Sequence, residues 1–392
     1  MLTRDCVDRF LGWCRAERTT TPALFHTPAA VRAAVATLRA GLGAEVSYAT
    51  KANAHPFMLA ELADTVDEFN VTNLAHAKAL LDQGIAPDRI AFVNPVTPDR
   101  VLAAVADLGV DRFVVDDLRG LDAVRKACGQ PKLTLRVRPP DIGQSARSVV
   151  RFGNTPETVT AIAGQAARFG IEIEALSFFV GTSGDDMANG TPFKLGIDRL
   201  AQVHESLARL DIPVRTVNLG GGFAGARRQF FADHPGFFAA IRDELAARFG
   251  TGAGVRCEPG RFLSEPSMAA VAQVIADRVL DGNRIVHLDI SAYTGLFESC
   301  FIDGGGENLH LFVTGKDEPA AGAAVVGPVM DSFDVVKRHA SLPPLDPGDL
   351  VLIPNVGAYS WGYTSTCEGL PTLEPIPLPG DLDRELATAT YA

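Results

Sequence analysis

The feature that most constrains the fold is an alternation of two kinds of segment across residues 45–260. Short apolar runs bounded by turn residues recur eight times, as EVSYAT (45–50), EFNVT (68–72), RIAFV (89–93), RFVVD (112–116), KLTLRV (132–137), IEALSFFV (173–180), VRTVNLG (214–220) and GVRCEPG (254–260). Between them lie Ala/Leu-rich stretches with helical spacing, which end at glycine as helix C-caps do. Strands alternating with helices pair in parallel through crossovers. Eight such units predict a (β/α)8 barrel rather than an open doubly wound sheet.

The two ends of the chain follow other patterns. Residues 1–25 predict a short helix and then a polar break, ERTTTP, and we expect this segment to pack on the C-terminal domain. After about residue 265 the chain changes to short, β-branched, turn-separated runs such as NRIVHLDIS and DLVLIPNVG. The expected organisation is therefore an N-terminal segment (1–25), a barrel (26–265) and an all-β domain without helices of any length (266–392).

Composition narrows the class of protein. The 392 residues are 47% hydrophobic and carry a formal net charge of -11, with no block of basic residues, so nucleic-acid binding is not expected. No run of about 18 apolar residues is present to cross a membrane. The six cysteines are widely spaced and contain no CxxC pair, which favours free thiols in the cytoplasm over disulfides or a metal site.

Chemically distinctive residues fall where the predicted barrel strands end, which is where active sites of this fold collect. Lys51 ends the first strand, and a lysine there can form an imine, although most lysines are surface charges. The glycines at 220–222 end the seventh strand and can surround a phosphate with backbone N–H groups. Glu258 and Arg261 follow the eighth strand, either as a local salt bridge or as a ring-nitrogen partner and a phosphate ligand. Together these are the parts that pyridoxal phosphate requires.

Seven motifs carry a resemblance that covers residues 22–360. YATKAN, RFGNT, SFFVGTSG, LGGGF, EPGRF, GPVMDSFD and VGAYS are similar, in this order, to the motifs of the fold type III pyridoxal phosphate decarboxylases, the ornithine/diaminopimelate/arginine decarboxylase family. The resemblance implies an alanine racemase-like barrel with a C-terminal β domain. It also implies a pyridoxal 5'-phosphate enzyme that decarboxylates an amino acid.

The resemblance also implies roles for individual residues. Lys51 would carry the cofactor as an imine, and Glu258 would bind its pyridine nitrogen and keep it protonated. The phosphate would be held by Gly220, Gly221, Gly222, Arg261 and Tyr359. Further cofactor contacts would come from Asn70, Arg147, Phe179, Thr182 and Gly260. A racemase of this fold type typically places an arginine at the ring nitrogen, so Glu258 favours decarboxylation and leaves racemisation as the alternative.

Three positions depart from the family pattern. Asn70 stands where a carboxylate is usual, and Phe179 stands where a histidine is common. Met330 replaces the cysteine of GPxCD that returns a proton to the substrate, and a thioether has no proton to give. Cys367 could supply a thiol instead, or it could be a buried structural cysteine.

The acids near these motifs suggest the substrate. Asp331, after Met330, and Asp303, at the end of an expected strand ESCFID, match positions where family members present carboxylates to a distal ammonium. They favour an ornithine-like or lysine-like amino acid, or a derivative, and a role in polyamine biosynthesis. The resemblance implies a homodimer in which GPVMDSFD reaches the neighbouring subunit's site. A non-catalytic relative that binds a protein partner stays open because the cysteine is missing.

Overall fold

A computed structural model describes residues 2–140, 151–181, 190–227, 234–250, 252–301, 306–316 and 318–391. The chain divides into two compact units. The barrel unit comprises Val35–Ala224 and Phe230–Gly260, and the sheet unit comprises Met1–Ala34, Gly225–Gln229 and Arg261–Ala392. The domain boundaries expected near residues 25 and 265 stay predictions.

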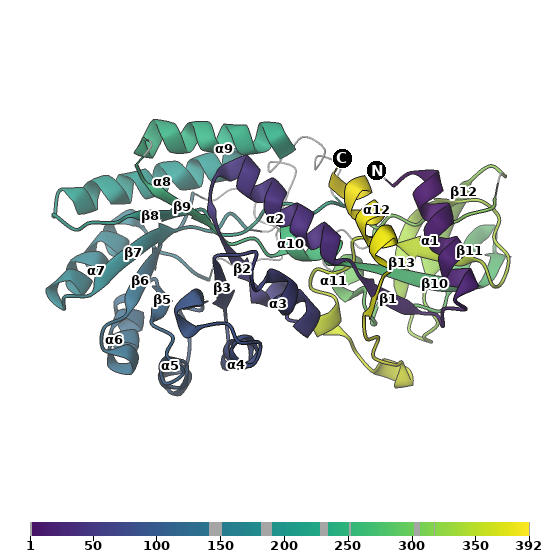
Figure 1. The fold of residues 1–392 in the computed structure, drawn as a ribbon, viewed down its shortest axis with the longest axis horizontal. Coiled ribbons are helices and arrows are strands. Elements are labelled where there is room, and N and C mark those ends of the chain that lie inside the picture. Colours follow the sequence, from purple (N-terminus) through teal and green to yellow (C-terminus); the bar gives the residue numbers. More distant parts are fainter. Residues whose placement is uncertain are drawn as a thin grey trace. The chain divides into compact units, whose positions relative to one another are not determined.

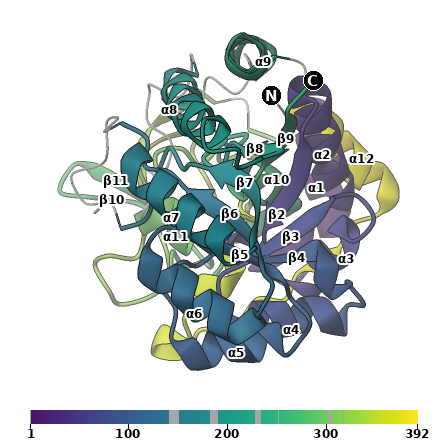
Figure 2. The ribbon, with the colours of Figure 1, turned by 90° about the vertical axis from the view of Figure 1, so that its left-hand side faces the viewer.

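The barrel unit contains a closed barrel of eight parallel strands, which confirms the predicted fold class. Figure 2 looks toward the barrel, with its helices around the strands. The strands are β2 (Glu45–Ala49), β3 (Glu68–Val71), β4 (Ile90–Phe92), β5 (Arg112–Val115), β6 (Lys132–Arg136), β7 (Glu172–Ser177), β8 (Thr216–Asn218) and β9 (Gly254–Cys257). The helices around them are α2 (Pro28–Leu42, which begins in the sheet unit), α3 (Pro56–Leu62), α4 (Leu74–Asp82), α5 (Asp99–Ala106), α6 (Leu118–Cys128), α7 (Pro156–Arg168), α8 (Thr191–Ala208) and α9 (His234–Phe249).

Several of these helices begin where the sequence supplies a cap. Asn73, Asp117 and Thr155 each accept a hydrogen bond from a backbone N–H in the first turn of α4, α6 and α7. Asn73 and Asp117 follow within two residues of a strand, so the chain turns back there along the outside of the barrel. The carboxyl ends of all eight strands therefore collect at one end of the barrel.

A ring of charges fills one layer of the barrel interior near the amino ends of the strands. Its members alternate in sign and come from every second strand: Glu68 on β3, Arg112 on β5, Glu174 on β7 and Arg256 on β9. The N–O distances around the ring are 3.1, 3.4, 3.2 and 3.4 Å. Barrel layers are usually built from Val, Ile and Leu, and here mutual pairing lets charged groups occupy the same place.

The sheet unit is organised around a seven-stranded sheet with the order β13-β12-β11-β10-β1-β15, in which β14 also pairs with β10. Its strands are β1 (Ala23–His26), β10 (Met268–Leu280), β11 (Asn283–Leu288), β12 (Ala321–Val326), β13 (Val335–Leu342), β14 (Leu350–Ile353) and β15 (Ile376–Pro377). Figure 1 shows the long β10 alongside β1. The N-terminal strand β1 thus completes a sheet whose other strands come from beyond residue 265.

Two helices pack on this sheet. Helix α1 (Arg4–Ala16) buries Cys6, Val7, Phe10, Leu11 and Cys14, which share one face. That face joins one core with strand residues and with Leu382 and Leu386 of α12 (Gly380–Tyr391).

The prediction that the C-terminal part contains no helices was wrong. Besides α12, the short helix α11 (Phe297–Phe301) lies there, and α10 (Arg261–Ser264) ends just before residue 266. The ESCFID stretch, predicted as a strand, begins within α11, where the rings of Phe297 and Phe301 pack against each other one turn apart. Within the described ranges, no helix is both long and apolar enough to span a membrane.

Candidate active site

Lys51 lies just beyond the carboxyl end of β2, in a short 3-10 helix (Thr50–Ala52) rather than at the last strand position. The prediction that Lys51 is itself a strand residue was therefore wrong. The chain turns here because the hydroxyl of buried Tyr48 donates a 2.9 Å hydrogen bond to the carbonyl of Asn53, across the lysine. The N–H of Ala49 donates to the carbonyl of Pro259 at 3.1 Å, which joins this turn to the EPGR turn after β9.

The surroundings of Lys51 favour its neutral amine. Its side chain reaches solvent, yet protein surrounds it on most sides, and this desolvation lowers the pKa of Lys51. The positive charge of Arg136 lowers the pKa further, while Glu258 opposes the shift. A lysine that loses its proton more readily is a better nucleophile toward a carbonyl group.

Glu258 is held in place by Asn218, the last residue of β8. The Asn218 amide nitrogen donates a 2.8 Å hydrogen bond to Oε1 of Glu258. Its amide oxygen accepts from the N–H of Gly220 at 2.9 Å, and the N–H of Glu258 donates to the carbonyl of Gly220 at 2.7 Å. The local salt bridge with Arg261 was one of the two alternatives open from the sequence. In the described residues the carboxylate of Glu258 accepts from this neutral amide instead.

The glycine turn has a steric reason for its composition. Gly220 has φ +64°, and a Cβ built on it would lie 2.0 Å from the carbonyl oxygen of Phe178. A Cβ on Gly221 would lie 2.8 Å from the carbonyl oxygen of Glu258. Gly222 also has a positive φ, of +98°. These glycines therefore allow three strand ends to approach one another closely.

Arg136, the last residue of β6, is not among the predicted site residues. Its guanidinium lies 5.6 Å from the ring centre of Phe152 and 5.5 Å from that of Phe179. Phe179 is 37% exposed and therefore presents part of its ring outward. Asn218 was missed altogether, and its position two residues before the glycine turn is the signal that could have found it.

Asn70 takes a different environment from the other strand-end residues. It is buried on β3, and its amide donates to the carbonyl of Ser47 at 3.3 Å. Gly260 is buried at the end of the EPG turn. Both assignments to the cofactor stay predictions.

In the sheet unit, Arg261 and Tyr359 lie together. The guanidinium of Arg261 is 5.3 Å from the ring centre of Tyr359, and burial raises the pKa of that phenol. Arg261 is bound by both oxygens of Glu298, one of them at 3.0 Å from its NH1, and it also approaches Glu265 at 3.5 Å. Arg227 completes this buried cluster at 3.2 Å from Glu265.

The loop of GPVMDSFD also belongs to the sheet unit. Met330 is 92% exposed, and its N–H donates to Glu368 at 3.1 Å. Asp331 accepts a 2.5 Å hydrogen bond from the hydroxyl of Tyr293, which lowers the pKa of this carboxyl, and the N–H of Phe333 adds to the effect. Asp331 is thus held in its ionised form.

Four predicted site residues cannot be placed. Arg147, Thr182 and Asp303 lie outside the described residues, as does the side chain of Cys367, whose backbone forms a 3-10 helix (Cys367–Gly369).

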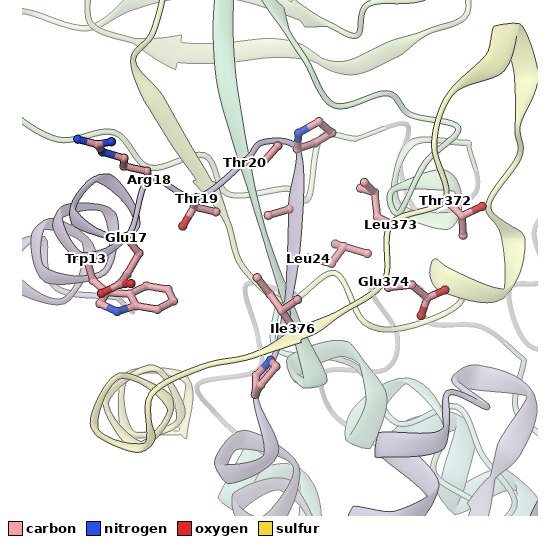
Figure 3. A pocket seen from close by; sticks show the side chains of 13 residues that line it. Trp13, Glu17, Arg18, Thr19, Thr20, Leu24, Thr372, Leu373, Glu374 and Ile376 are labelled. Carbon is pink, nitrogen blue, oxygen red and sulfur yellow. The ribbon is translucent and has the colours of Figure 1, made fainter.

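A groove of about 590 Å³ lies in the sheet unit beside β1, and Figure 3 shows its lining. Trp13, Leu24, Leu373 and Ile376 line it together with polar groups such as Glu17. None of the predicted site residues is among its lining residues. The groove is therefore not the predicted active site.

Comparison with known proteins identifies the family. The model of the pyridoxal-dependent decarboxylase family, pyridoxal binding domain, matches residues 29–265, which is more than half of the chain. The chain belongs to this family. As in other pyridoxal-dependent decarboxylases, the cofactor is pyridoxal phosphate, and the chain is an amino-acid decarboxylase.

Individual relatives span most of this decarboxylase. The chloroplastic ornithine decarboxylase of Nicotiana glauca is 30% identical over 339 residues, covering 83% of this chain and 76% of the relative. Antizyme inhibitor 2 of Xenopus laevis is 24% identical over 339 residues, with 82% and 73% covered. The solved lysine/ornithine decarboxylase of Vibrio vulnificus, complexed with cadaverine, has a TM-score of 0.83 at 24% identity and covers 96% of this chain and 100% of that one. That structural likeness shows the shared fold.

The described residues of the barrel unit suit the cofactor. An amine with a lowered pKa, a carboxylate oriented by a neutral amide and a glycine turn with no room for a Cβ lie at the carboxyl ends of β2, β9 and β8. These features match the covalent anchor, the ring-nitrogen partner and the phosphate cradle that pyridoxal phosphate needs.

Proposed function

We propose that this protein decarboxylates a basic amino acid of the ornithine or lysine kind and releases carbon dioxide and an amine. The observation that carries the proposal is that Lys51 and Glu258 lie at the same end of the barrel, where the charge of Glu258 acts on the pKa of Lys51 and Asn218 fixes the carboxylate. Relatives named as ornithine decarboxylases support the same substrate class.

The roles of the chain's own residues follow from their chemistry. Bound pyridoxal phosphate supplies an electron sink for the pair left behind when a carboxylate departs as carbon dioxide. Lys51 anchors the cofactor through its amine and is available to carry a proton near the reacting carbon. Glu258 holds the proton at the ring nitrogen, and Asn218 keeps Oε1 of Glu258 fixed while it does so. Arg136, whose guanidinium lies between two aromatic rings, keeps positive charge near Lys51 and Glu258.

Asp331 supports the choice of a basic substrate. An ionised carboxylate recognises an ammonium group at the far end of the amino acid, and Asp331 is kept ionised by the Tyr293 hydroxyl. We assign Asp303 to the same role from the family resemblance. A role in polyamine biosynthesis follows from such a substrate.

Two alternatives predict different products. A racemase would return an amino acid that keeps its carboxylate and loses its chirality, but Glu258 at the ring nitrogen argues for the stronger electron sink. A non-catalytic binding protein is favoured by the match to an antizyme inhibitor and by Met330 in place of the family cysteine. Lys51, with its lowered pKa, argues against a protein without cofactor.

The test begins with the purified protein. It should show the visible absorbance of pyridoxal phosphate bound to a lysine. Reduction with borohydride followed by mass spectrometry should then locate the cofactor on Lys51. Carbon dioxide release from ornithine, lysine and arginine should then be measured. Cofactor on another lysine, or racemised amino acid without carbon dioxide, would contradict the proposal.

The proposed assembly is a homodimer with active sites shared across the interface, and the proposed location is the cytoplasm. If Asp331 serves the neighbouring subunit, mixing Lys51→Ala chains with Asp331→Ala chains should restore part of the activity through one intact site per mixed dimer. Chains that exchange subunits but stay inactive would show that each subunit is complete alone.

A further inference from the structure

Tyr293 and Asp331 form a hydrogen bond between two segments that are 38 residues apart in sequence. The phenol donates to Oδ2 of Asp331 at 2.5 Å, and the N–H of Phe333 donates to Oδ1 at 2.9 Å. Each carboxylate oxygen thus has one protein donor. A carboxylate has about four lone-pair positions, so Asp331 can still accept hydrogen bonds from a cationic ligand.

A buried aspartate holds both segments together. Asp334 is 2% exposed, and its Oδ1 accepts from the Ser291 hydroxyl at 2.9 Å and from the Ala292 N–H at 2.7 Å. Its Oδ2 accepts from the N–H of Val329 at 3.1 Å. Asp334 therefore joins the segment that precedes Tyr293 to the loop that carries Asp331.

At the start of this loop the backbone packs closely against the side chain of Asp334. A Cβ on Gly327 would lie 2.2 Å from Oδ2 of Asp334. The N–H of Asp334 also donates to the carbonyl of Asp331 at 2.9 Å, which closes the turn on itself. Asp331 thus lies on a turn that is held together by hydrogen bonds within the chain.

The ring of Tyr293 is itself supported. Its ring centre lies 5.2 Å from that of Phe301, whose ring centre lies 4.9 Å from that of Phe297. The ring of Tyr363 stacks on Phe297 with 5.7 Å between the ring centres. The phenol therefore approaches Asp331 from a packed row of rings and not from a free side chain.

We propose that Tyr293 is a positioning residue that sets the selectivity of Asp331 for substrates and products with a distal ammonium group. The proposal rests on the proposed function, in which Asp331 binds that ammonium. The hydroxyl fixes one carboxylate oxygen of Asp331, so that the remaining lone pairs of the carboxylate face an incoming ammonium group in one orientation. The nearby charged groups Asp334 and Glu368 are also acids, which adds to the preference for a cation.

The decisive variant is Tyr293→Phe in the complete, cofactor-loaded protein. We expect KM for the better of ornithine and lysine, and the dissociation constant of putrescine or cadaverine measured by calorimetry, to rise about threefold to tenfold. Turnover number and cofactor absorbance should stay within twofold. The acid limb of kcat/KM should move to higher pH, because Asp331 loses the hydrogen bond that favours its ionised form.

Two companion variants separate the outcomes. Tyr363→Phe removes a hydroxyl from the same row of rings, and within the described part of the chain that hydroxyl makes no hydrogen bond, so it should change none of these quantities. Asp331→Ala should weaken amine binding more than Tyr293→Phe does. If Asp331→Ala weakens binding and Tyr293→Phe does not, the inference about Tyr293 is wrong and the proposed function stands. If neither variant has an effect, or the unmodified protein binds no diamine, both the inference and the substrate assignment are overturned.

Discussion

A 2.8 Å hydrogen bond joins Asn218, the last residue of β8, to Glu258, which lies just beyond the end of the neighbouring strand β9. The donor is a neutral amide whose oxygen is already occupied by the N–H of Gly220. Such an amide cannot rotate freely, so it presents its N–H to Glu258 in one orientation. The geometry of the proposed ring-nitrogen partner therefore depends on a residue that makes no ionic interaction of its own.

The first prediction concerns this pair. Asn218→Ala should lower turnover per bound cofactor by roughly tenfold or more, because a hydrogen bond to a charged group contributes about 1.5–3 kcal/mol. Steady-state kinetics normalised to cofactor absorbance would measure the effect. Glu258→Gln should be slower still, and an Asn218→Ala protein with unchanged turnover would mean that Glu258 is positioned by other contacts.

The second prediction concerns the pH dependence of Lys51. Only the neutral amine attacks a carbonyl, and burial and Arg136 both lower the pKa of Lys51 below its ordinary value of 10.5. The rate at which cofactor-free protein gains absorbance on addition of pyridoxal phosphate should therefore rise with a midpoint below pH 10.5.

Removal of the Arg136 charge tests the direction of the pKa shift of Lys51. In Arg136→Gln the pKa of Lys51 should increase, so the midpoint should move to higher pH. Lys51→Ala should show no absorbance change at any pH. A midpoint that does not move in Arg136→Gln would show that Arg136 does not contribute to the lowered pKa of Lys51.

The third prediction uses two glycines with similar backbone angles. Gly220 and Gly43 have φ values of +64° and +62°, but a Cβ on Gly43 would meet nothing within 4 Å. Gly43→Ala should destabilise the protein by roughly 1 kcal/mol, the cost of a positive φ alone. Gly220→Ala should cost clearly more and also reduce cofactor binding, because the Phe178 carbonyl must move. Denaturant unfolding and cofactor titration of both variants would test this, and equal losses would exclude the steric explanation.

The fourth prediction concerns the buried cluster around Arg261. Glu298 lies within hydrogen-bonding distance of Arg261 and 3.5 Å from Arg227, and all these side chains are at most 9% exposed. Glu298→Ala leaves the two buried guanidinium groups of Arg227 and Arg261 to share the carboxylate of Glu265, and should destabilise the protein by about 3 kcal/mol or more. Asp346→Ala breaks the exposed pair with Lys316 and should have no measurable effect. Similar losses in the two variants would argue against a special role of burial.

The fifth prediction concerns proton return. Met330 cannot donate a proton, so part of the turnovers should end in an aldehyde rather than an amine. Met330→Cys should lower that fraction, and Met330→Leu, which adds no thiol, should not. A well-placed general acid contributes roughly 10²- to 10⁴-fold, so product analysis should be joined by rate measurement. Cys367→Ala should raise the aldehyde fraction if Cys367 is the acid, and unchanged products would remove it from the mechanism.

The sequence by itself determined the barrel and the kinds of residue at its strand ends. Alternating apolar runs and helical stretches leave few other ways to bury the apolar surface, and parallel strands bring their carboxyl ends together. Lys51, Gly220 and Glu258 could therefore be named from their places in the pattern. The family motifs added the cofactor and the reaction class.

Only the tertiary structure decided which of these groups interact. The bonds from Asn218 to Glu258 and from Tyr293 to Asp331 join residues 40 and 38 positions apart. The pairing of Arg261 with Glu298, and not with Glu258, depends in the same way on the path of the chain between them. Local composition does not encode such contacts, because strand register and loop path determine which side chains meet. For the same reason, the helices after residue 265 depend on packing that a pattern of β-branched runs does not contain.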